Sequence, residues 1–189
     1  MDAISLQGGF AEAAPEAARA FRAVLNAMAR PGTVEPVAGA RPPAPLSMAA
    51  GVVLLTLADT TTPMHLAPSH DLPVVRDWIT FHTGAPFVAA GRAVFALGDW
   101  AGLAPLDRFP IGTSEYPDRA ATLIVEVAAL APATHRLTGP GILDAAQLRL
   151  PGGEAARLNA GRFPLGLDLI LCCGDRLAGV PRTTKLEAL

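Results

Sequence analysis

Lysine is almost missing from this chain of 189 residues. Of its 15 basic residues, all but Lys185 are arginines, and Lys185 lies near the C-terminus. Catalysis by pyridoxal phosphate needs a lysine that forms a Schiff base with the cofactor. Because Lys185 follows the last strand that the sequence predicts, we expect no pyridoxal phosphate, and we predict no other cofactor.

A basic excess is also missing. The formal net charge is −2, from 15 basic and 17 acidic residues. A general nucleic-acid-binding protein needs a strong basic excess, so we expect no nucleic acid partner. A local anion site remains compatible with this charge. The hydrophobic fraction of 51% and the charged fraction of 17% are typical of a globular protein.

Long apolar segments and secretion signals are absent as well. No apolar run reaches the roughly 18–20 residues that a membrane span needs, and the first five residues lack the basic start of a signal peptide. The adjacent Cys172 and Cys173 have neither disulfide-framework nor zinc-ligand spacing. The sequence therefore predicts a cytoplasmic protein with reduced thiols and no membrane partner.

Familiar catalytic motifs are lacking too. The chain has no dinucleotide-binding Gly-x-Gly-x-x-Gly, no phosphate loop, no His-Glu-x-x-His and no Gly-x-Ser-x-Gly. Hydrolysis of ATP by a phosphate loop is therefore not expected of this chain alone. The chain has four histidines, His65, His70, His82 and His135, and they lack the spacing of a metal site on one helix face. We accordingly predict no metal.

The strongest pattern that is present predicts a helix from Pro15 to about Ala29, stopped by Pro31 and Gly32. Its apolar positions, spaced as on one buried face, are Phe21, Val24, Leu25 and Met28. Its polar positions on the opposite side are Arg19, Arg22, Asn26 and Arg30. This polar side is either a solvated face or a surface for a partner or an anion.

The remaining pattern predicts helices and strands in one α/β domain over residues 1–189, with a mixed β-sheet flanked by helices. Further helices are expected over 46–58 with Ser47 as N-cap, 69–82, 144–149 and 154–160. Strands are expected over 33–38, 64–66, 93–97, 121–127, 134–138, 165–173 and 176–180. The last two strands are expected to form a hairpin, and a short tail follows 181–184.

Polar residues and glycines at the ends of these elements are the candidates for a site, because loops at element ends commonly hold binding residues. The candidate ligand or partner contacts are Arg22, Arg30, His82, Thr83, Gly112, Thr113 and Arg182. For each of them turn chemistry is the alternative, in which Gly and Pro set the backbone and Thr caps it. No residue is assigned as catalytic.

Seven short motifs occur in a fixed order along the chain. They are Phe-Arg-x-x-Leu-x-Ala-Met-x-x-Pro-Gly at 21–32, Leu-Leu-Thr-Leu-Ala-Asp at 54–59, Phe-His-Thr-x-Ala-Pro at 81–86, Ala-Thr-Leu-Ile at 121–124, Arg-Leu-Thr-Gly-x-Gly-Ile at 136–142, Phe-Pro-Leu-Gly-x-Asp-Leu-Ile-Leu at 163–171 and Pro-Arg-Thr-Thr at 181–184. As an ordered set over about residues 10–187, they resemble the PhnH family, the H subunit of the bacterial carbon–phosphorus lyase system for phosphonate degradation.

The resemblance implies several properties. The fold is expected to be similar to that of pyridoxal-phosphate-dependent transferases with the cofactor site lost. The expected partners are the G, I and J subunits of a core complex, and a homodimer is expected for the isolated chain. With the ATP-binding L subunit, the G, H and I subunits of the family support replacement of adenine in ATP by an alkylphosphonate. The product is a ribose 1-phosphonate 5-triphosphate.

Two alternatives stay open from the residues. In the first, the chain is a structural adaptor and none of its residues touches substrate. In the second, it is an independent small-molecule enzyme with His82 as general base. No acid or nucleophile is spaced in the sequence to serve His82, which disfavours the second alternative.

Overall fold

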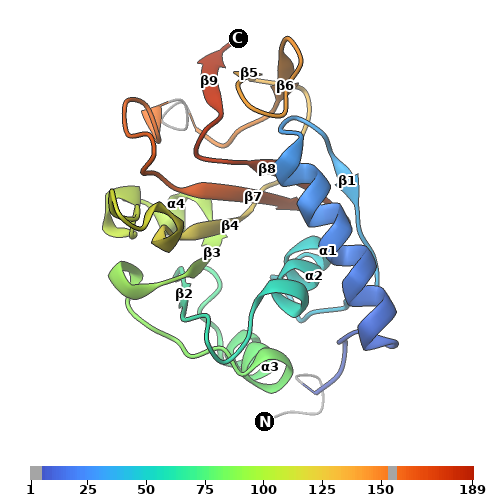
Figure 1. The fold of residues 1–189 in the computed structure, drawn as a ribbon. Helices are drawn as coiled ribbons and strands as arrows, with labels where there is room; N and C mark the ends of the chain where they lie inside the picture. The colour runs from blue at the N-terminus through green and yellow to red at the C-terminus, as the bar shows by residue number, and fades with distance from the viewer. Residues whose placement is uncertain (1–5, 153–156) are drawn as a thin grey trace.

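The computed structural model describes residues 6–152 and 157–189. Its centre is a mixed sheet with the strand order β1-β8-β7-β4-β3-β2 (Figure 1). The parallel strands are β2 (Met64–Leu66), β3 (Phe95–Asp99), β4 (Thr122–Glu126) and β7 (Asp168–Cys173). Antiparallel strands β8 (Arg176–Val180) and β1 (Glu35–Pro36) complete the sheet. The predicted α/β class, the mixed sheet and the 165–180 hairpin are therefore confirmed.

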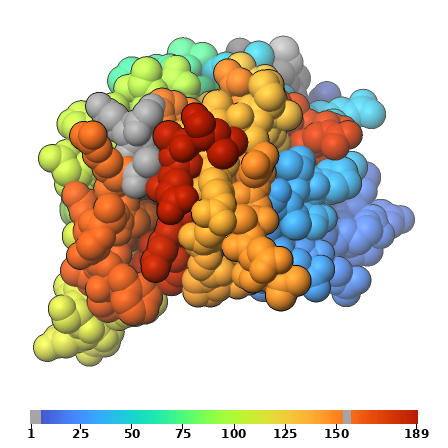
Figure 2. All heavy atoms as spheres, turned by 90° about the horizontal axis from the view of Figure 1, so that it is seen from above, coloured from blue at the N-terminus to red at the C-terminus, as the bar shows by residue number. Residues whose placement is uncertain are grey.

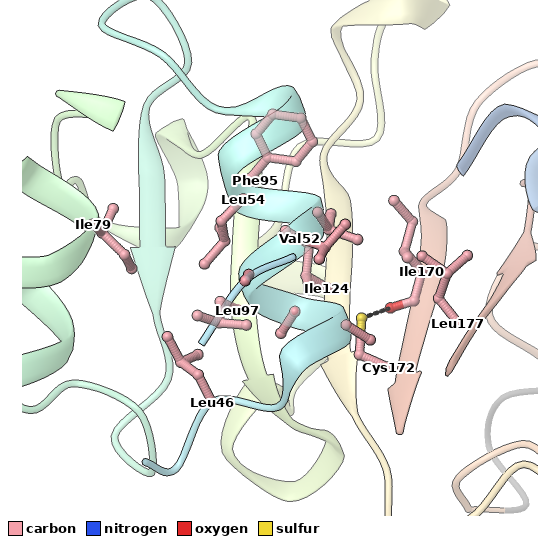
Figure 3. Close-up of a cluster of buried hydrophobic side chains, with 14 of the residues drawn as sticks. Leu46, Val52, Leu54, Ile79, Phe95, Leu97, Ile124, Ile170, Cys172 and Leu177 are labelled. Atoms are coloured by element: carbon pink, nitrogen blue, oxygen red, sulfur yellow. Dashed lines mark hydrogen bonds between the residues drawn. The ribbon is translucent and has the colours of Figure 1, made fainter. Parts of the chain in front are cut away.

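Three helices cover one face of this sheet. They are α1 (Ala13–Ala29), α2 (Met48–Leu57) and α3 (Pro73–Thr83). Because side chains alternate between the two faces of a strand, every second strand residue points to these helices, and Leu97, Ile124 and Ile170 pack there (Figure 3). The predicted Ser47 cap is confirmed, since its hydroxyl accepts the Ala50 N–H at 3.1 Å.

The other face of the sheet carries a second core, to which Leu123, Leu169 and Val180 contribute. A small antiparallel sheet packs on this face, with the order β6-β5-β9. Its strands are β5 (His135–Thr138), β6 (Ala146–Leu148) and β9 (Lys185–Ala188). The short helices are α4 (Trp100–Leu103), η1 (Ala90–Arg92), η2 (Leu106–Arg108) and η3 (Pro117–Arg119). The three long helices thus flank one face and a sheet covers much of the other.

Helix α1 lies very close to strand β8. A Cβ on Gly179 would come within 2.7 Å of the Ala27 carbonyl oxygen. Such a close approach admits only small side chains, and the buried residues of α1 are Ala20, Val24 and Ala27. The prediction that Phe21 and Leu25 are buried is therefore wrong: they are 52% and 53% exposed.

Two further predictions are corrected at the small sheet. The segment 144–149 was expected to be helical, but its centre is strand β6, with Gln147 exposed between half-buried Ala146 and buried Leu148. A segment this short does not separate a helical period from a strand period. The C-terminal residues were expected to be a tail, but β9 pairs with β5, with Lys185 opposite Thr138.

Other boundaries differ less. Helix α3 begins at Pro73 and not at Ser69, because proline is well suited to the first helical turn. Of the helix predicted over 154–160, residues 154–156 lie outside the described residues, and the prediction is wrong for 158–160, which form bends and a turn. Within the described ranges, no helix has the length and apolar character needed to cross a membrane.

Candidate functional site

The predicted site residues His82 and Thr83 lie together at the end of α3. The Thr83 hydroxyl donates to the Ile79 carbonyl at 2.8 Å and accepts the Ala85 N–H at 3.1 Å. The His82 ring stacks near Trp78, with centroids 4.8 Å apart, and its Nε2 lies 3.2 Å from the Gln7 carbonyl. These contacts close a helix and hold the N-terminal segment against it.

The predicted pair Gly112 and Thr113 begins a tight turn. Thr113 and Tyr116 exchange two backbone hydrogen bonds at 3.1 Å, and the Thr113 hydroxyl accepts the Tyr116 N–H at 3.0 Å. Gly112 lies against Pro117, whose carbonyl oxygen would be 2.7 Å from an added Cβ. The pair therefore shapes a turn.

Arg22 belongs to α1 and Arg30 follows the last residue of that helix, and both are exposed. Arg30 ends the helix, and its N–H donates to the Asn26 carbonyl at 2.9 Å. The Arg30 carbonyl in turn accepts the Thr33 hydroxyl at 2.8 Å. Both guanidinium groups lie on the helix surface.

Arg182 is bound inside the protein by Asp168. Its Nη2 lies 2.6 Å from Asp168 Oδ2 and its Nε 3.3 Å from Oδ1, while its backbone N–H donates to Oδ1 at 2.8 Å. Its Nη1 also donates to the Pro117 carbonyl. The two charged side chains are only 18% and 13% exposed. This fork joins three segments: the loop after β8, the start of β7 and the turn that Gly112 begins.

Asp168 is the functional partner that the sequence analysis missed. It was included only as one position of the 163–171 motif, and it proves to be the first residue of β7. A lone acid in an otherwise apolar segment is a useful signal, because a buried carboxylate usually has a cationic or hydrogen-bonding partner.

Motifs that are far apart in the sequence meet around Arg182. Gly141 has φ of +82°, and a Cβ there would lie 2.0 Å from the Ala29 carbonyl oxygen at the end of α1. The turn 139–141 therefore fits against the helix exit only as glycine. Thr138, in the same motif, pairs with Lys185 across the small sheet. The segments around 29–32, 138–141, 163–168 and 181–185 thus form one end of the molecule.

A cavity of about 480 Å³ opens at this end, between the segment 157–166 and strand β9. Figure 2 shows this segment in orange beside the red β9. The polar and aromatic residues that line the cavity are Asn159, Phe163, Arg182, Thr183, Thr184 and Lys185. We name it the β9 cavity. Of the predicted site residues, only Arg182 lies in it.

The wall of the β9 cavity is held by hydrogen bonds. The Asn159 carboxamide donates to the Leu167 carbonyl at 2.9 Å and accepts the Leu167 N–H at 2.8 Å. The Gly166 N–H donates to the Ile111 carbonyl at 3.0 Å. The cavity is therefore largely formed before any ligand arrives, as is usual for small-molecule sites.

The chemistry of the β9 cavity favours binding over bond making. None of the described residues that line it is Asp or Glu, and Lys185 makes no salt bridge to any described residue. Thr184 is only 5% exposed, and its hydroxyl has no hydrogen-bond partner among the described residues. Phe163 is 75% exposed. The lining thus offers a cation and an aromatic face.

A second group of titratable residues lies at the carboxyl ends of the parallel strands. Burial raises the pKa of Glu126 at the end of β4, while the Ser47 N–H, 2.7 Å from Oε1, acts in the opposite direction. Burial lowers the pKa of His70, and nearby Asp99 partly offsets it. Glu126 also lines a small pocket of about 280 Å³. Within the described ranges, no three His, Cys, Asp or Glu residues converge as a metal site would require.

Known proteins resemble this chain over nearly its whole length. The model of a family described as bacterial phosphonate metabolism protein (PhnH) matches residues 8–187. The alpha-D-ribose 1-methylphosphonate 5-triphosphate synthase subunit PhnH of Rhizobium meliloti (strain 1021) is 39% identical over 189 residues, covering 95% of this chain and 94% of that protein. The putative C-P lyase subunit protein HtxG of Stutzerimonas stutzeri is 34% identical over 186 residues, covering 92% and 87%.

Proposed function

This chain belongs to the PhnH family of bacterial phosphonate metabolism proteins, and we propose that it is a subunit of a carbon–phosphorus lyase system. The assembled enzyme would replace the adenine of ATP by an alkylphosphonate and so form a ribose 1-phosphonate 5-triphosphate. The observation that carries this proposal is the 39% identity to the Rhizobium meliloti synthase subunit across nearly all of both chains.

In this reaction an oxygen of the phosphonate attacks C1′ of the ribose with its electron pair. The bond from C1′ to the adenine nitrogen breaks, and adenine leaves with the bonding electrons and takes up a proton. We propose that this chain contributes assembly and binding surface and is inactive alone. The surroundings of His82 support this, because its Nε2 lies 3.2 Å from a backbone carbonyl and aromatic rings flank it.

The outer face of α1 supports assembly with partners. Phe21 and Leu25 are about half exposed on neighbouring turns, with Arg22 beside them, and Figure 1 shows α1 at the edge of the molecule. Exposed apolar side chains that gather on one helix face are a common feature of subunit contacts. We propose that this face binds within a core complex of G, I and J subunits, and that the isolated chain is a homodimer. Light scattering on the purified chain tests the dimer.

Co-expression with the G, I and J subunits tests the proposed function. We expect this chain to co-purify with them in a fixed ratio. Adenine release from ATP, measured with methylphosphonate and the L subunit, should disappear when the chain is omitted and return when it is added back. Assembly and adenine release at the same rate without the chain would contradict the proposal.

A structural adaptor is the second candidate, and it is favoured by Arg182, whose charge is already balanced by Asp168 inside the protein. The variants Arg30→Gln and His82→Gln, made separately, distinguish the two roles. Loss of adenine release with the complex intact would indicate contact with substrate. Loss that occurs only through disassembly would indicate an adaptor.

We also propose that the fold is that of the pyridoxal-phosphate-dependent transferases without the cofactor site. The position of Lys185 supports the loss of the site, because β9 belongs to the small sheet and not to the parallel strands. Stoichiometric pyridoxal phosphate should give no visible imine absorbance band. The free thiols of Cys172 and Cys173 support a reducing, cytoplasmic location.

A further inference from the structure

Lys185 gives the β9 cavity its positive character. It is the only lysine in the sequence, and it is an exposed residue that makes no salt bridge to any residue within 6–152 or 157–189. Arg182 lines the same cavity, but its charge is balanced by Asp168. With no described carboxylate in the lining, the cavity has a net charge that attracts an anion.

Hydrogen-bond donors accompany this charge. A guanidinium group has five N–H donors, and the contacts of Arg182 with Asp168 and Pro117 use three of them. The remaining N–H groups of Arg182, one on Nη1 and one on Nη2, donate no hydrogen bond to the described residues and are available to an oxyanion in the cavity.

The third feature is Phe163, which lines the cavity while 75% of it remains exposed. An exposed aromatic ring provides a stacking face for a planar base, and such stacking is sequence-independent because every base has a π-face. The cavity volume of about 480 Å³ lies within the usual range for small-molecule sites. A cation and an aromatic face thus border one space.

We propose that the β9 cavity binds a nucleotide, with phosphate oxygens at Lys185 and the base against Phe163. Arg182 positions the loop 181–184 and adds hydrogen-bond donors, while its charge is balanced by Asp168. The choice of ATP as the nucleotide rests on the proposed function. The chain would then hold a substrate for the assembled enzyme and would not be only an adaptor.

Binding of ATP is measured by calorimetry on the purified chain and on the assembled complex. Lys185→Gln should weaken ATP binding about tenfold, since a charge-assisted contact is lost, and should flatten its dependence on salt. Lys185→Arg should keep most of the affinity. Arg92→Gln, which removes an exposed charge from η1, is the matched control and should leave binding unchanged.

Further ligands separate the parts of the site. Phe163→Leu should weaken the binding of ATP and adenosine several-fold and leave the binding of methylphosphonate and inorganic phosphate unaffected. Lys185→Gln should instead weaken the binding of these two simple anions. The proposal would be overturned if both variants bind ATP as tightly as the unchanged protein, in the isolated chain and in the complex. It would also be overturned if neither the chain nor the complex binds ATP.

Two other outcomes are equally decisive. If Phe163→Leu dissociates the complex while ATP binding by the isolated chain stays unchanged, Phe163 is a subunit contact and the nucleotide assignment is wrong. If the complex assembles and releases adenine normally with Lys185→Gln, the proposed function stands and only the nucleotide site fails. A chain that binds ATP but does not assemble would reject the proposed function and keep the site.

Discussion

The β9 cavity and the outer face of α1 both draw on motif residues, yet they are built in opposite ways. The cavity is concave, with a largely apolar lining that also carries Arg182 and Lys185, and its backbone is fixed by side-chain bonds such as those of Asn159 and Asp168. The outer face of α1 is convex and apolar around Phe21 and Leu25. A concave space with a few charged groups can enclose a small ligand, whereas a convex apolar face is suited to another protein surface. The difference supports the two separate roles that we propose for one chain.

Breaking the buried ion pair should have the largest effect. Asp168→Ala leaves the Arg182 charge without its partner, and we expect the free energy of unfolding to fall by about 3–5 kcal/mol. Urea denaturation measures the change. Asp175→Ala, which removes an exposed partner 3.9 Å from Arg176, is the control and should cost within about 0.5 kcal/mol. Equal losses in the two variants would show that the pair does not brace the cavity.

The turn that joins the cavity end to helix α1 should be next in sensitivity. Gly141→Ala adds a Cβ 2.0 Å from the Ala29 carbonyl at a positive φ, so we expect a loss of about 2–3 kcal/mol. Gly174→Ala has a positive φ of +59° but no atom within 4 Å of its added Cβ. It should lose only about 1 kcal/mol. Thermal unfolding of the two variants separates the steric contact from backbone strain alone.

Changing the outer face of α1 should affect assembly rather than folding. Phe21→Ser with Leu25→Ser should weaken binding to the complex by about 2 kcal/mol, because such apolar anchors dominate interfaces. The unfolding free energy of the chain should change by less than this, since both side chains are half exposed. Phe81→Ser, at the same 52% exposure on α3, is the control for assembly. A loss of stability with unchanged assembly would contradict the assembly role of the outer face of α1.

Glu126 belongs to neither region and should give the smallest effect. Its pKa is raised above the ordinary 4.5 by burial, so the native state binds a proton that the unfolded state releases. The stabilising contribution is present below pH 4.5 and is lost as pH rises through the raised pKa. Glu126→Gln should lack this loss of stability, which urea denaturation at a series of pH values measures. Glu187→Gln changes an exposed side chain and is the control. Its plot of unfolding free energy against pH should run parallel to that of the unchanged protein.

The sequence predicted the helical period of α1 correctly and its buried face only in part, since Val24 is buried but Phe21 and Leu25 are half exposed. Period depends on local spacing, which the sequence contains. The face depends on the distance to β8, because Gly179 lies against the backbone at Ala27, and the residues buried on this side of α1 are Ala20, Val24 and Ala27. Phe21 and Leu25, the larger apolar residues, were therefore displaced to the exposed side.

The site was predicted only in part. Arg182 was identified as a candidate, but Asp168, Phe163 and Lys185 were not, because their roles arise only when separate segments meet. His82, Thr83, Gly112 and Thr113 were selected as turn residues, and the structure shows them making turn and helix-end contacts. Whether they or Arg22 and Arg30 contact a ligand or partner stays a prediction.

By itself, the sequence determined the α/β class, the mixed sheet, the β7–β8 hairpin and the Ser47 cap. These depend on periodicity, turn residues and caps, which act over a few neighbouring positions. Only the tertiary structure decided that the last residues form β9, that Arg182 binds Asp168 and that Lys185 borders a cavity with Phe163. Pairing across long stretches of chain depends on which surfaces fit together, and no local pattern contains that information.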